Sequence, residues 1–470
     1  MEPHGPRFGG GATATLLHPA VVVLMLLAIV LFFVLPRRYI IVPVMTATFL
    51  IPLGQQFLIG GVHLFVSRIV ILAAFIRAFT SRPKSLYSGG WTSIDTAFTC
   101  YVLISAAATV IRYQDGAALV NQIGYVWDFL LAYLLLRSLI RDEQDSFLTI
   151  KCFAVLMVLL GAAMMYEQMK MVNVFGLLGG VNAIPEAREG KIRSQGVFQH
   201  ALTAGTFAAT AIPLFFLLWK NGKDKTLAVV GIAAATVMTV TTQTSTSLLT
   251  YAAAVGAVLL WPIRKKMKTV RIGLAAAIVG LHFVMKAPVW FLIARIDLTG
   301  SSSSYHRAEL IDQFINHFSS WWLIGTKDAA TWGWDMWDAQ NMYVSVGEAG
   351  GLAAFIFYIL VISRCFSRLG DARKRAKDKN QEWFIWLLGS ALFANVVAFF
   401  GVNYFDQSVI AWFALVSMIC ACTIPLVNKE LKVRTAGSVL ELQPSVSTIA
   451  NGLPETEVDA ARSVSHHLFD

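Results

Sequence analysis

The chain has 470 residues, of which 56% are hydrophobic and 14% are charged, and its mean hydropathy is +0.63. Soluble domains carry roughly a quarter charged residues, so a soluble globular protein is excluded. The formal net charge of +10 lies mostly in short segments between apolar runs, where basic residues orient membrane proteins, and nucleic acid is therefore excluded as a partner.

Apolar runs close to the length needed to cross a bilayer core of about 30 Å recur along the chain. We therefore predict an all-α fold, a polytopic integral membrane helix bundle with 12–13 transmembrane helices. Both numbers stay open because the second, eighth and ninth runs are short. The predicted spans lie near residues 18–35, 40–54, 62–80, 95–111, 119–137, 147–166, 201–219, 226–241, 247–262, 272–287, 342–363, 383–400 and 407–426.

Lysine and arginine are concentrated in every second connection between the predicted spans. Arg37 and Arg38 follow the first span, and a basic cluster from Arg264 to Arg271 follows the ninth. This alternation predicts an outer N-terminus and a cytoplasmic C-terminus. We expect a transmembrane domain over residues 1–428 and a polar, disordered cytoplasmic tail over residues 429–470.

Two connections are longer than the others, and both are predicted on the outer side, over about 167–199 and about 287–341. The first ends in KIRSQGVFQHALTAG, in which Arg193 stands just before a span. Basic residues at such positions commonly anchor a helix at the membrane interface, whereas a guanidinium group can also bind phosphate through two parallel hydrogen bonds. Taken alone, this segment favours anchoring.

The second long loop contains SSSSYHRAELIDQF, which places His306 and Arg307 on a predicted short helix. Taken alone, this segment favours a solvated surface helix. Further along the loop, five of the 13 tryptophans fall within 17 residues. An aromatic belt at the interface and a stacking surface for sugar rings are equally supported interpretations. These tryptophans are Trp321, Trp322, Trp332, Trp334 and Trp337.

Arg68, Asp128 and Glu348 are ionisable residues that lie at depth in predicted spans. Charges at such depth are costly unless they are paired or face a wet cavity, so they are candidates for a functional site. We hypothesise that Arg68 pairs with Glu348 or Asp128 and lines a cavity open to the outside. Attachment of one helix to another is a nearly equal alternative.

Together, the order of these segments resembles the O-antigen ligase and polymerase superfamily, whose members move glycans from polyprenyl-pyrophosphate carriers. Arg193 followed by Gly196-Val197-Phe198 is similar to an arginine and Gly-Thr-Phe entering a span in that family. Arg307 is similar to a second arginine early in the large loop. Gln340-Asn341, nine residues and Gly351 are similar to the His-Asn and Gly-x-x-Gly that close this loop. In layout the likeness covers residues from about 60 to 425.

The sequence departs from the family pattern at three places. Gln340 stands where the family has histidine, Ala354 replaces the last glycine, and Thr244-Ser245 occupies the place of a Ser-Arg pair. Glutamine can donate and accept hydrogen bonds but cannot act as a base near neutral pH. Either the histidine acts mainly in binding, or another group has taken over its role. The candidates for that role are His200, His306, Asp338 and Glu348.

The resemblance implies a GT-C-like glycosyltransferase architecture with a large extracytoplasmic loop, in the bacterial inner membrane with its active site facing the periplasm. It implies a metal-independent, inverting enzyme without cofactors, in which Arg193, Arg307 and Gln340 are catalytic. The expected partners are a polyprenyl-pyrophosphate-linked oligosaccharide, a glycan or lipid-linked acceptor, membrane lipids and other polysaccharide-assembly proteins. The expected substrate-binding residues are Asn341, His200, His306, Arg68, Glu348, Trp334 and Trp337.

An exopolysaccharide or O-antigen polymerase is favoured over a ligase that uses lipid A–core as acceptor. A transporter or flippase for lipid-linked glycans is a different class, but no inverted internal repeat is detectable and the polar groups gather at one face. A catalytically inactive, glycan-binding homologue remains a third alternative because of Gln340.

Overall fold

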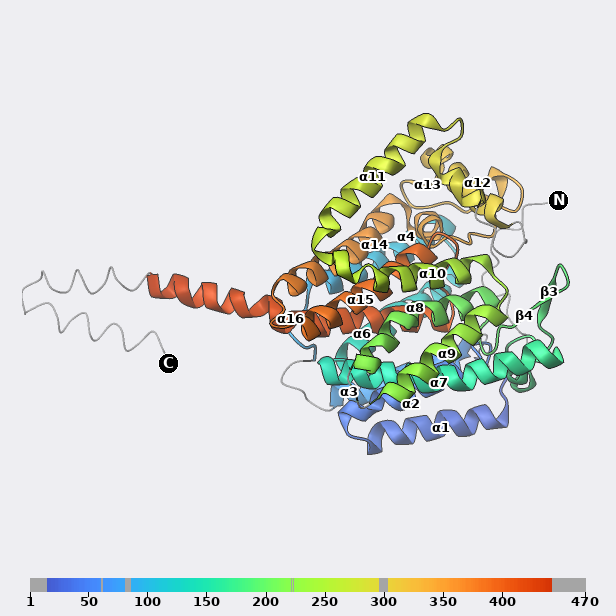
Figure 1. The fold of residues 1–470 in the computed structure, drawn as a ribbon. Helices are drawn as coiled ribbons and strands as arrows, with labels where there is room; N and C mark the ends of the chain where they lie inside the picture. The colour runs from blue at the N-terminus through green and yellow to red at the C-terminus, as the bar shows by residue number, and fades with distance from the viewer. Residues whose placement is uncertain are drawn as a thin grey trace, which may run out of the picture.

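A computed structural model describes residues 15–60, 62–80, 86–220, 222, 224–295 and 303–441. In this part of the chain, long helices run back and forth side by side and form one bundle (Figure 1). The helices are α1 (Pro19–Val34), α2 (Ile41–Leu50), α3 (Val66–Thr80), α4 (Ser93–Tyr113), α5 (Gly116–Val126), α6 (Ala132–Leu139), α7 (Glu143–Lys170), α8 (Ala201–Lys220), α9 (Lys225–Thr241), α10 (Ser245–Leu259), α11 (Met267–Val284), α12 (Ser303–Asn316), α13 (Phe318–Trp321), α14 (Met342–Lys374), α15 (Lys379–Ala398) and α16 (Gln407–Glu441).

Shorter elements connect these helices. Two antiparallel hairpins, β1–β2 and β3–β4, are the strand pairs of the described residues. A single turn of π-helix, η2, joins α5 to α6. The bounds are β1 (Gln56–Ile59), β2 (Val62–Phe65), β3 (Glu186–Arg188), β4 (Lys191–Arg193), η1 (Arg37–Ile40), η2 (Trp127–Leu131), η3 (Val174–Leu178), η4 (Trp261–Lys266), η5 (Val289–Arg295) and η6 (Ala329–Trp332).

Eight helices of the described chain are long and apolar enough to cross a membrane, by length and composition. Three shorter apolar helices, α1, α9 and α10, accompany them. These observations support the predicted all-α bundle and a multi-pass membrane protein. Each of the predicted spans contains a helix, but α2 has 10 residues and is about 15 Å long, which is half the thickness of a bilayer core.

The two ends of the bundle differ in what they carry. Both hairpins lie at one end, called the hairpin end below, together with α12 and α13 of the second long loop (Figure 1). This loop has a small apolar core of its own, which is separate from the main core of the bundle. It consists of Leu310, Phe314, Trp321, Trp332 and Met336, together with Val344 from the first turn of α14.

The last helix, α16, continues through Glu441, so the predicted domain boundary at residue 428 falls inside a helix. Residues 442–470, the rest of the predicted tail, lie outside the described residues. The helix leaves the bundle at the end opposite the hairpins (Figure 1).

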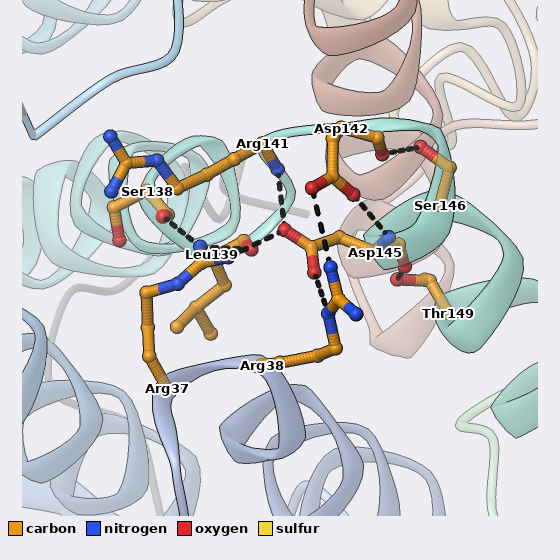
Figure 2. Close-up of polar contacts among 9 residues, drawn as sticks. All are labelled: Arg37, Arg38, Ser138, Leu139, Arg141, Asp142, Asp145, Ser146 and Thr149. Atoms are coloured by element: carbon orange, nitrogen blue, oxygen red, sulfur yellow. Dashed lines mark hydrogen bonds and ion pairs between the residues drawn. The ribbon is translucent and has the colours of Figure 1, made fainter.

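A network of charged side chains connects the turn between α1 and α2 with the turn between α6 and α7 (Figure 2). The carboxylate of Asp145, at the start of α7, accepts hydrogen bonds from Arg37 at 2.8 Å and from Arg38 at 3.1 Å. Arg37 also donates to the carbonyl of Leu139 at 3.0 Å. The side chain of Asp145 is 2% exposed, whereas that of Asp142, 3.4 Å from Arg38, is 50% exposed. The two arginines therefore attach the α1–α2 turn to the ends of α6 and α7.

Replacing Asp145 by alanine should destabilise the fold by about 3 kcal/mol, because it leaves Arg37 without its buried carboxylate. The exposed neighbour Asp142 gives the comparison: it caps α7 by accepting the N–H of Asp145 at 2.7 Å, and Asp142→Ala should cost about 1 kcal/mol. Thermal unfolding of both variants in the same detergent measures the difference. Equal losses would show that the ion pairs of Asp145 contribute no more than the helix cap at Asp142.

Candidate functional site

Arg193 is held at the hairpin end by the β3–β4 hairpin, whose register places it opposite Glu186. The two side chains form an ion pair at 3.7 Å, and 14% of the arginine side chain is exposed. Burial lowers the pKa of Arg193, which Glu186 partly offsets, and the group remains a cation at neutral pH. The next residue, Ser194, donates its backbone N–H to the carbonyl of Thr241 at 3.1 Å, which fixes the strand against the end of α9.

The Gly196-Val197-Phe198 segment is fixed by two polar side chains from the preceding loop and helix. Glu167, at the end of α7, accepts the backbone N–H groups of Gln195 at 3.0 Å and Gly196 at 2.9 Å. Asn173 donates to the carbonyl of Gly196 at 2.7 Å. Gly196 has a φ of +59°, which favours glycine. Because Val197 and Phe198 are fully buried, the chain enters α8 in one defined position just after Arg193.

Arg307, the second predicted arginine, lies on α12 and is 6% exposed. It packs beside Gly401, in the turn between α15 and α16: a Cβ added to Gly401 would lie 3.3 Å from Nε of Arg307 and 2.7 Å from the hydroxyl oxygen of Thr246. Arg307 and the first turn of α10 therefore meet at this glycine.

The turn between α9 and α10 connects the surroundings of the two arginines. It runs from Thr241, which Ser194 contacts, to Thr246 beside Gly401. Its hydroxyl groups are buried and bond to one another, as Thr244 donates to Ser247 at 2.6 Å. Thr244-Ser245 of this turn stands where the resembling family has Ser-Arg. The turn lies next to the end of the first long loop at Thr241 and next to Gly401, beside Arg307, at Thr246.

Gln340 and Asn341 lie where the second long loop returns to the bundle, next to the segment that contains Gly401. The Asn341 side chain caps α14 by accepting from the N–H groups of Tyr343 and Val344, and it donates to the carbonyl of Phe400 at 3.2 Å. This contact is one residue away from Gly401. Asn341 is 1% exposed, and its hydrogen bonds hold the start of α14 against the turn between α15 and α16.

The amide of Gln340 donates to the carboxylate of Asp338 at 2.6 Å. Nε2 of His306 lies 3.3 Å from the backbone carbonyl of Asp338. Because a carbonyl oxygen can only accept, Nε2 of His306 donates in this hydrogen bond. The structure thus brings together His306, Arg307, Gln340 and Asn341, and it adds the Asp338 carboxylate to them.

His200 lies on the other side of the 400–406 segment. Its ring packs on Phe405, with centroids 5.6 Å apart. The adjacent Asp406 is buried and accepts from the Thr203 hydroxyl at 2.6 Å and from the Ser408 N–H at 3.0 Å. Burial raises the pKa of Asp406, and these hydrogen bonds oppose the rise. Sequence reasoning missed Asp406, although an acidic residue directly before a long apolar run was a usable signal.

Arg68 pairs with Asp128, one of the two partners that the sequence proposed. Nε and Nη2 of Arg68 donate to the carboxylate at distances of 2.7 to 3.1 Å, and Nη1 donates to the carbonyl of His63 at 3.2 Å. The pair borders a cavity of about 260 Å³ at the hairpin end. Glu348, the other proposed partner, is not bonded to Arg68.

Glu348 instead lies in a part of α14 that is fixed by Arg112, a residue that sequence reasoning did not single out. Nη1 of Arg112 donates to the carbonyls of Ile324 at 2.5 Å, Glu348 at 3.0 Å and Ala349 at 3.2 Å. Helix α14 is broken at Gly351, which has φ +70°. The second long loop inserts at this break, and the N–H of Leu352 donates to the carbonyl of Trp322 at 2.7 Å.

The five clustered tryptophans divide into two buried rings and three exposed ones, of which Trp322 is 45% exposed. Trp321 and Trp332 are 4% and 7% exposed and belong to the small core of the loop. Trp334 and Trp337, the two predicted to bind substrate, are 86% and 73% exposed. Their rings are available to a membrane interface or a ligand, but no described contact brings them to Arg307.

The chain matches no protein-family model, and no curated protein matches its sequence. Among the described residues, no group of three or more histidine, cysteine, aspartate or glutamate side chains could hold a metal ion. The site therefore rests on its own geometry: two arginines, a hydroxyl-rich turn and the Asp338–Gln340 pair gather at the hairpin end. Such a site can bind an anion through the guanidinium groups and accept a proton on a carboxylate.

We expect Gly351→Ala to separate the second long loop from α14. An added Cβ would lie 2.7 Å from the carbonyl oxygen of Leu323, and the backbone conformation of Gly351, φ +70° and ψ −170°, costs about 1–3 kcal/mol for other residues. Gly370→Ala on the same helix, where a Cβ meets nothing within 4 Å, should be neutral or stabilise by up to about 1 kcal/mol. Limited proteolysis of the loop, with thermal unfolding, compares the two variants. Equal protection would show that the break at Gly351 is not needed for docking.

Proposed function

We propose that the chain is an integral membrane glycosyltransferase that uses a polyprenyl-pyrophosphate-linked glycan at the outer face of the bacterial cytoplasmic membrane. The observation that carries the proposal is that one Thr/Ser-rich turn adjoins the surroundings of both arginines. Ser194, which follows Arg193, bonds to Thr241 at one end of the turn, and Arg307 packs on Gly401 beside Thr246 at the other. Two cations brought to one place from different loops match a ligand with two phosphates. The GT-C-like architecture is part of this proposal.

The reaction suits the groups present. When the acceptor hydroxyl oxygen forms a bond to the anomeric carbon, the bond from that carbon to the pyrophosphate oxygen breaks and its electron pair leaves with the pyrophosphate. Arg193 and Arg307 stabilise this departing charge, as preorganised cations do at leaving groups. Attack from the face opposite the leaving group inverts the anomeric configuration. Because pyrophosphate leaves as a stable anion, neither a strong general acid nor a metal ion is required.

Asp338 is the group that we assign to receive the proton of the acceptor hydroxyl. The Gln340 amide donates to Oδ2 of Asp338, so Gln340 orients the carboxylate and need not itself act as a base. The carbonyl of Asp338 is fixed by Nε2 of His306. In this assignment Gln340 is a positioning residue, which accounts for glutamine at the place where the resembling family has histidine.

Two products are compatible with this site. We favour a polymerase that joins lipid-linked repeat units, and an O-antigen ligase that uses lipid A–core is the alternative. A transporter or binding protein for lipid-linked glycans is a different class, and the deep Arg68–Asp128 pair beside a cavity is the feature that favours it.

Purified protein in lipid nanodiscs, given only a polyprenyl-pyrophosphate-linked repeat unit, should produce a ladder of glycan lengths on a gel. The ladder should persist in EDTA. A single product that forms only when lipid A–core is added would identify a ligase. No transfer to either acceptor would contradict both enzyme assignments and favour the transporter or binding protein.

Arg193→Ala and Arg307→Ala should each lower the rate about 10²–10³-fold, because each removes a cation from the leaving pyrophosphate. Lysine at either position should restore part of the rate, since it keeps the charge but loses the two-point geometry. Arg188→Ala in the same hairpin is the control and should leave the rate within about twofold. Initial rates at saturating donor measure the effect. Full activity in both alanine variants would refute the proposed role of the arginines.

Gln340→Ala should slow transfer by about tenfold, because Asp338 loses the hydrogen bond that orients it. Gln340→His should keep turnover and add a new inflection near pH 6.5, the ordinary pKa of histidine. Asp338→Asn should abolish transfer in both backgrounds. A pH–rate profile of each variant makes the comparison. Full activity of Asp338→Asn would assign proton removal to another group.

A further inference from the structure

A second polar site lies within the hairpin end and is lined in part by Phe405 and Asp406. It is the cavity of about 260 Å³ bordered by α2, α3, the α5–η2 segment and the start of α16. The chemistry above does not use it. Its wall includes Thr48, Arg68, Asn121, Asp128, Phe405 and Asp406.

The charge of this wall disfavours a phosphate. Arg68 is the only lysine or arginine among the residues that line the cavity, all of which are described. Its guanidinium group is engaged by Asp128 through three hydrogen bonds and by the carbonyl of His63. Asp406 adds a second carboxyl group to the wall. Pyrophosphate would meet two acidic residues and one arginine that is already paired, so the cavity suits a neutral ligand.

The wall of the cavity contains both hydrogen-bonding groups and apolar surface. Thr48, Ser67 and Asn121 contribute hydroxyl and amide groups, and the Asp128 side chain is 36% exposed. Tyr125 and Phe129 provide a pair of tilted rings whose centroids lie 4.4 Å apart. A sugar ring has the complementary surface, with hydroxyl groups around its edge and apolar C–H groups on its faces. Drug-sized ligands occupy pockets of about 300–1,000 Å³, so 260 Å³ corresponds to one ring.

The π-helical turn helps to form this wall. Asp128 lies in η2, where the helix is widened by one residue. Such turns cost regular hydrogen bonding and occur frequently at functional sites. Here the turn places Asp128 next to Arg68 and in the wall of the cavity. Arg68 fixes the carboxylate, whose two oxygens can still accept hydrogen bonds from hydroxyl groups of a ligand.

The cavity is within reach of the proposed reaction site. Gly401, which packs against Arg307, is four residues from Phe405, which lines the cavity. Four residues span at most about 14 Å even when fully extended. A glycan with one ring in the cavity can therefore reach Arg307 within a few sugar units.

We propose that this cavity binds one neutral sugar ring of the glycan substrate, with Asp128 and Thr48 bonding its hydroxyl groups and Tyr125 and Phe129 contacting a face. This inference rests on the proposed function. The same chemistry could be presented by the donor glycan or by the acceptor glycan, and the experiment below distinguishes them.

Saturation-transfer difference NMR on the nanodisc-embedded protein tests binding directly, with methyl glycosides of glucose, galactose, mannose, rhamnose and N-acetylglucosamine as probes. At least one probe should bind. Thr48→Phe, which fills the cavity, should weaken that binding by at least tenfold, about 1.4 kcal/mol. Thr46→Phe is the matched control: Thr46 is half-buried on the same helix and does not line the cavity. Both variants should elute as monodisperse protein with unchanged thermal midpoints.

Thr48→Val gives a milder test that preserves shape and removes only the hydroxyl group, with Thr46→Val beside it. Weaker binding in Thr48→Val alone supports the site. If no probe binds, or if the two positions affect binding equally, the cavity is not a sugar site. Binding is measured without turnover, so this result stands whether or not the glycosyltransferase proposal survives.

The transfer assay then separates the two sources of the sugar. If Thr48→Val raises the KM for the acceptor and leaves that for the donor unchanged, the cavity binds the acceptor glycan. The opposite pattern assigns it to the donor glycan. Unchanged values for both, with the ladder intact, would overturn the proposal while leaving the proposed function in place.

Discussion

Where the second long loop packs against the apolar helix α14, the peptide groups of the loop are buried. Buried peptide groups need hydrogen-bond partners. Arg112 meets this requirement, since one guanidinium nitrogen donates to Ile324, Glu348 and Ala349 across the boundary between loop and helix. Gly351 provides the complementary break in α14, so that the loop backbone can approach the helix backbone. The position of α12, and with it Arg307, depends on this attachment.

The Thr/Ser-rich turn between α9 and α10 serves the first long loop in a similar way. Thr241 accepts the backbone N–H of Ser194, and the opposite end of the turn packs against Gly401 beside Arg307. Hydroxyl groups suit this place, because they satisfy one another when buried and bring no charge of their own. The turn itself therefore adds no charge to the surroundings of the two arginines.

The sequence was informative where a signal is local. Apolar length located the helices, and depth in a span marked Arg68 and Asp128, which do pair. The roles of Arg112 and Asp406 depend on partners more than 200 residues away, which no local pattern reveals. The tryptophans show the same limit: their spacing gave no means to separate buried Trp321 from exposed Trp334, because that difference arises from the folding of the loop on itself.

The π-helical turn also has a consequence for the rest of its helix. An α-helix turns by about 100° per residue, so one additional residue would normally rotate everything beyond it onto another face. The wider turn absorbs that rotation between Asp128 and Tyr133. Asp128 can then face Arg68 of α3 while Tyr133 and Arg137 face the buried Asp95 of α4. One continuous helical segment thereby presents Asp128 to α3 and, further along, Tyr133 and Arg137 to α4.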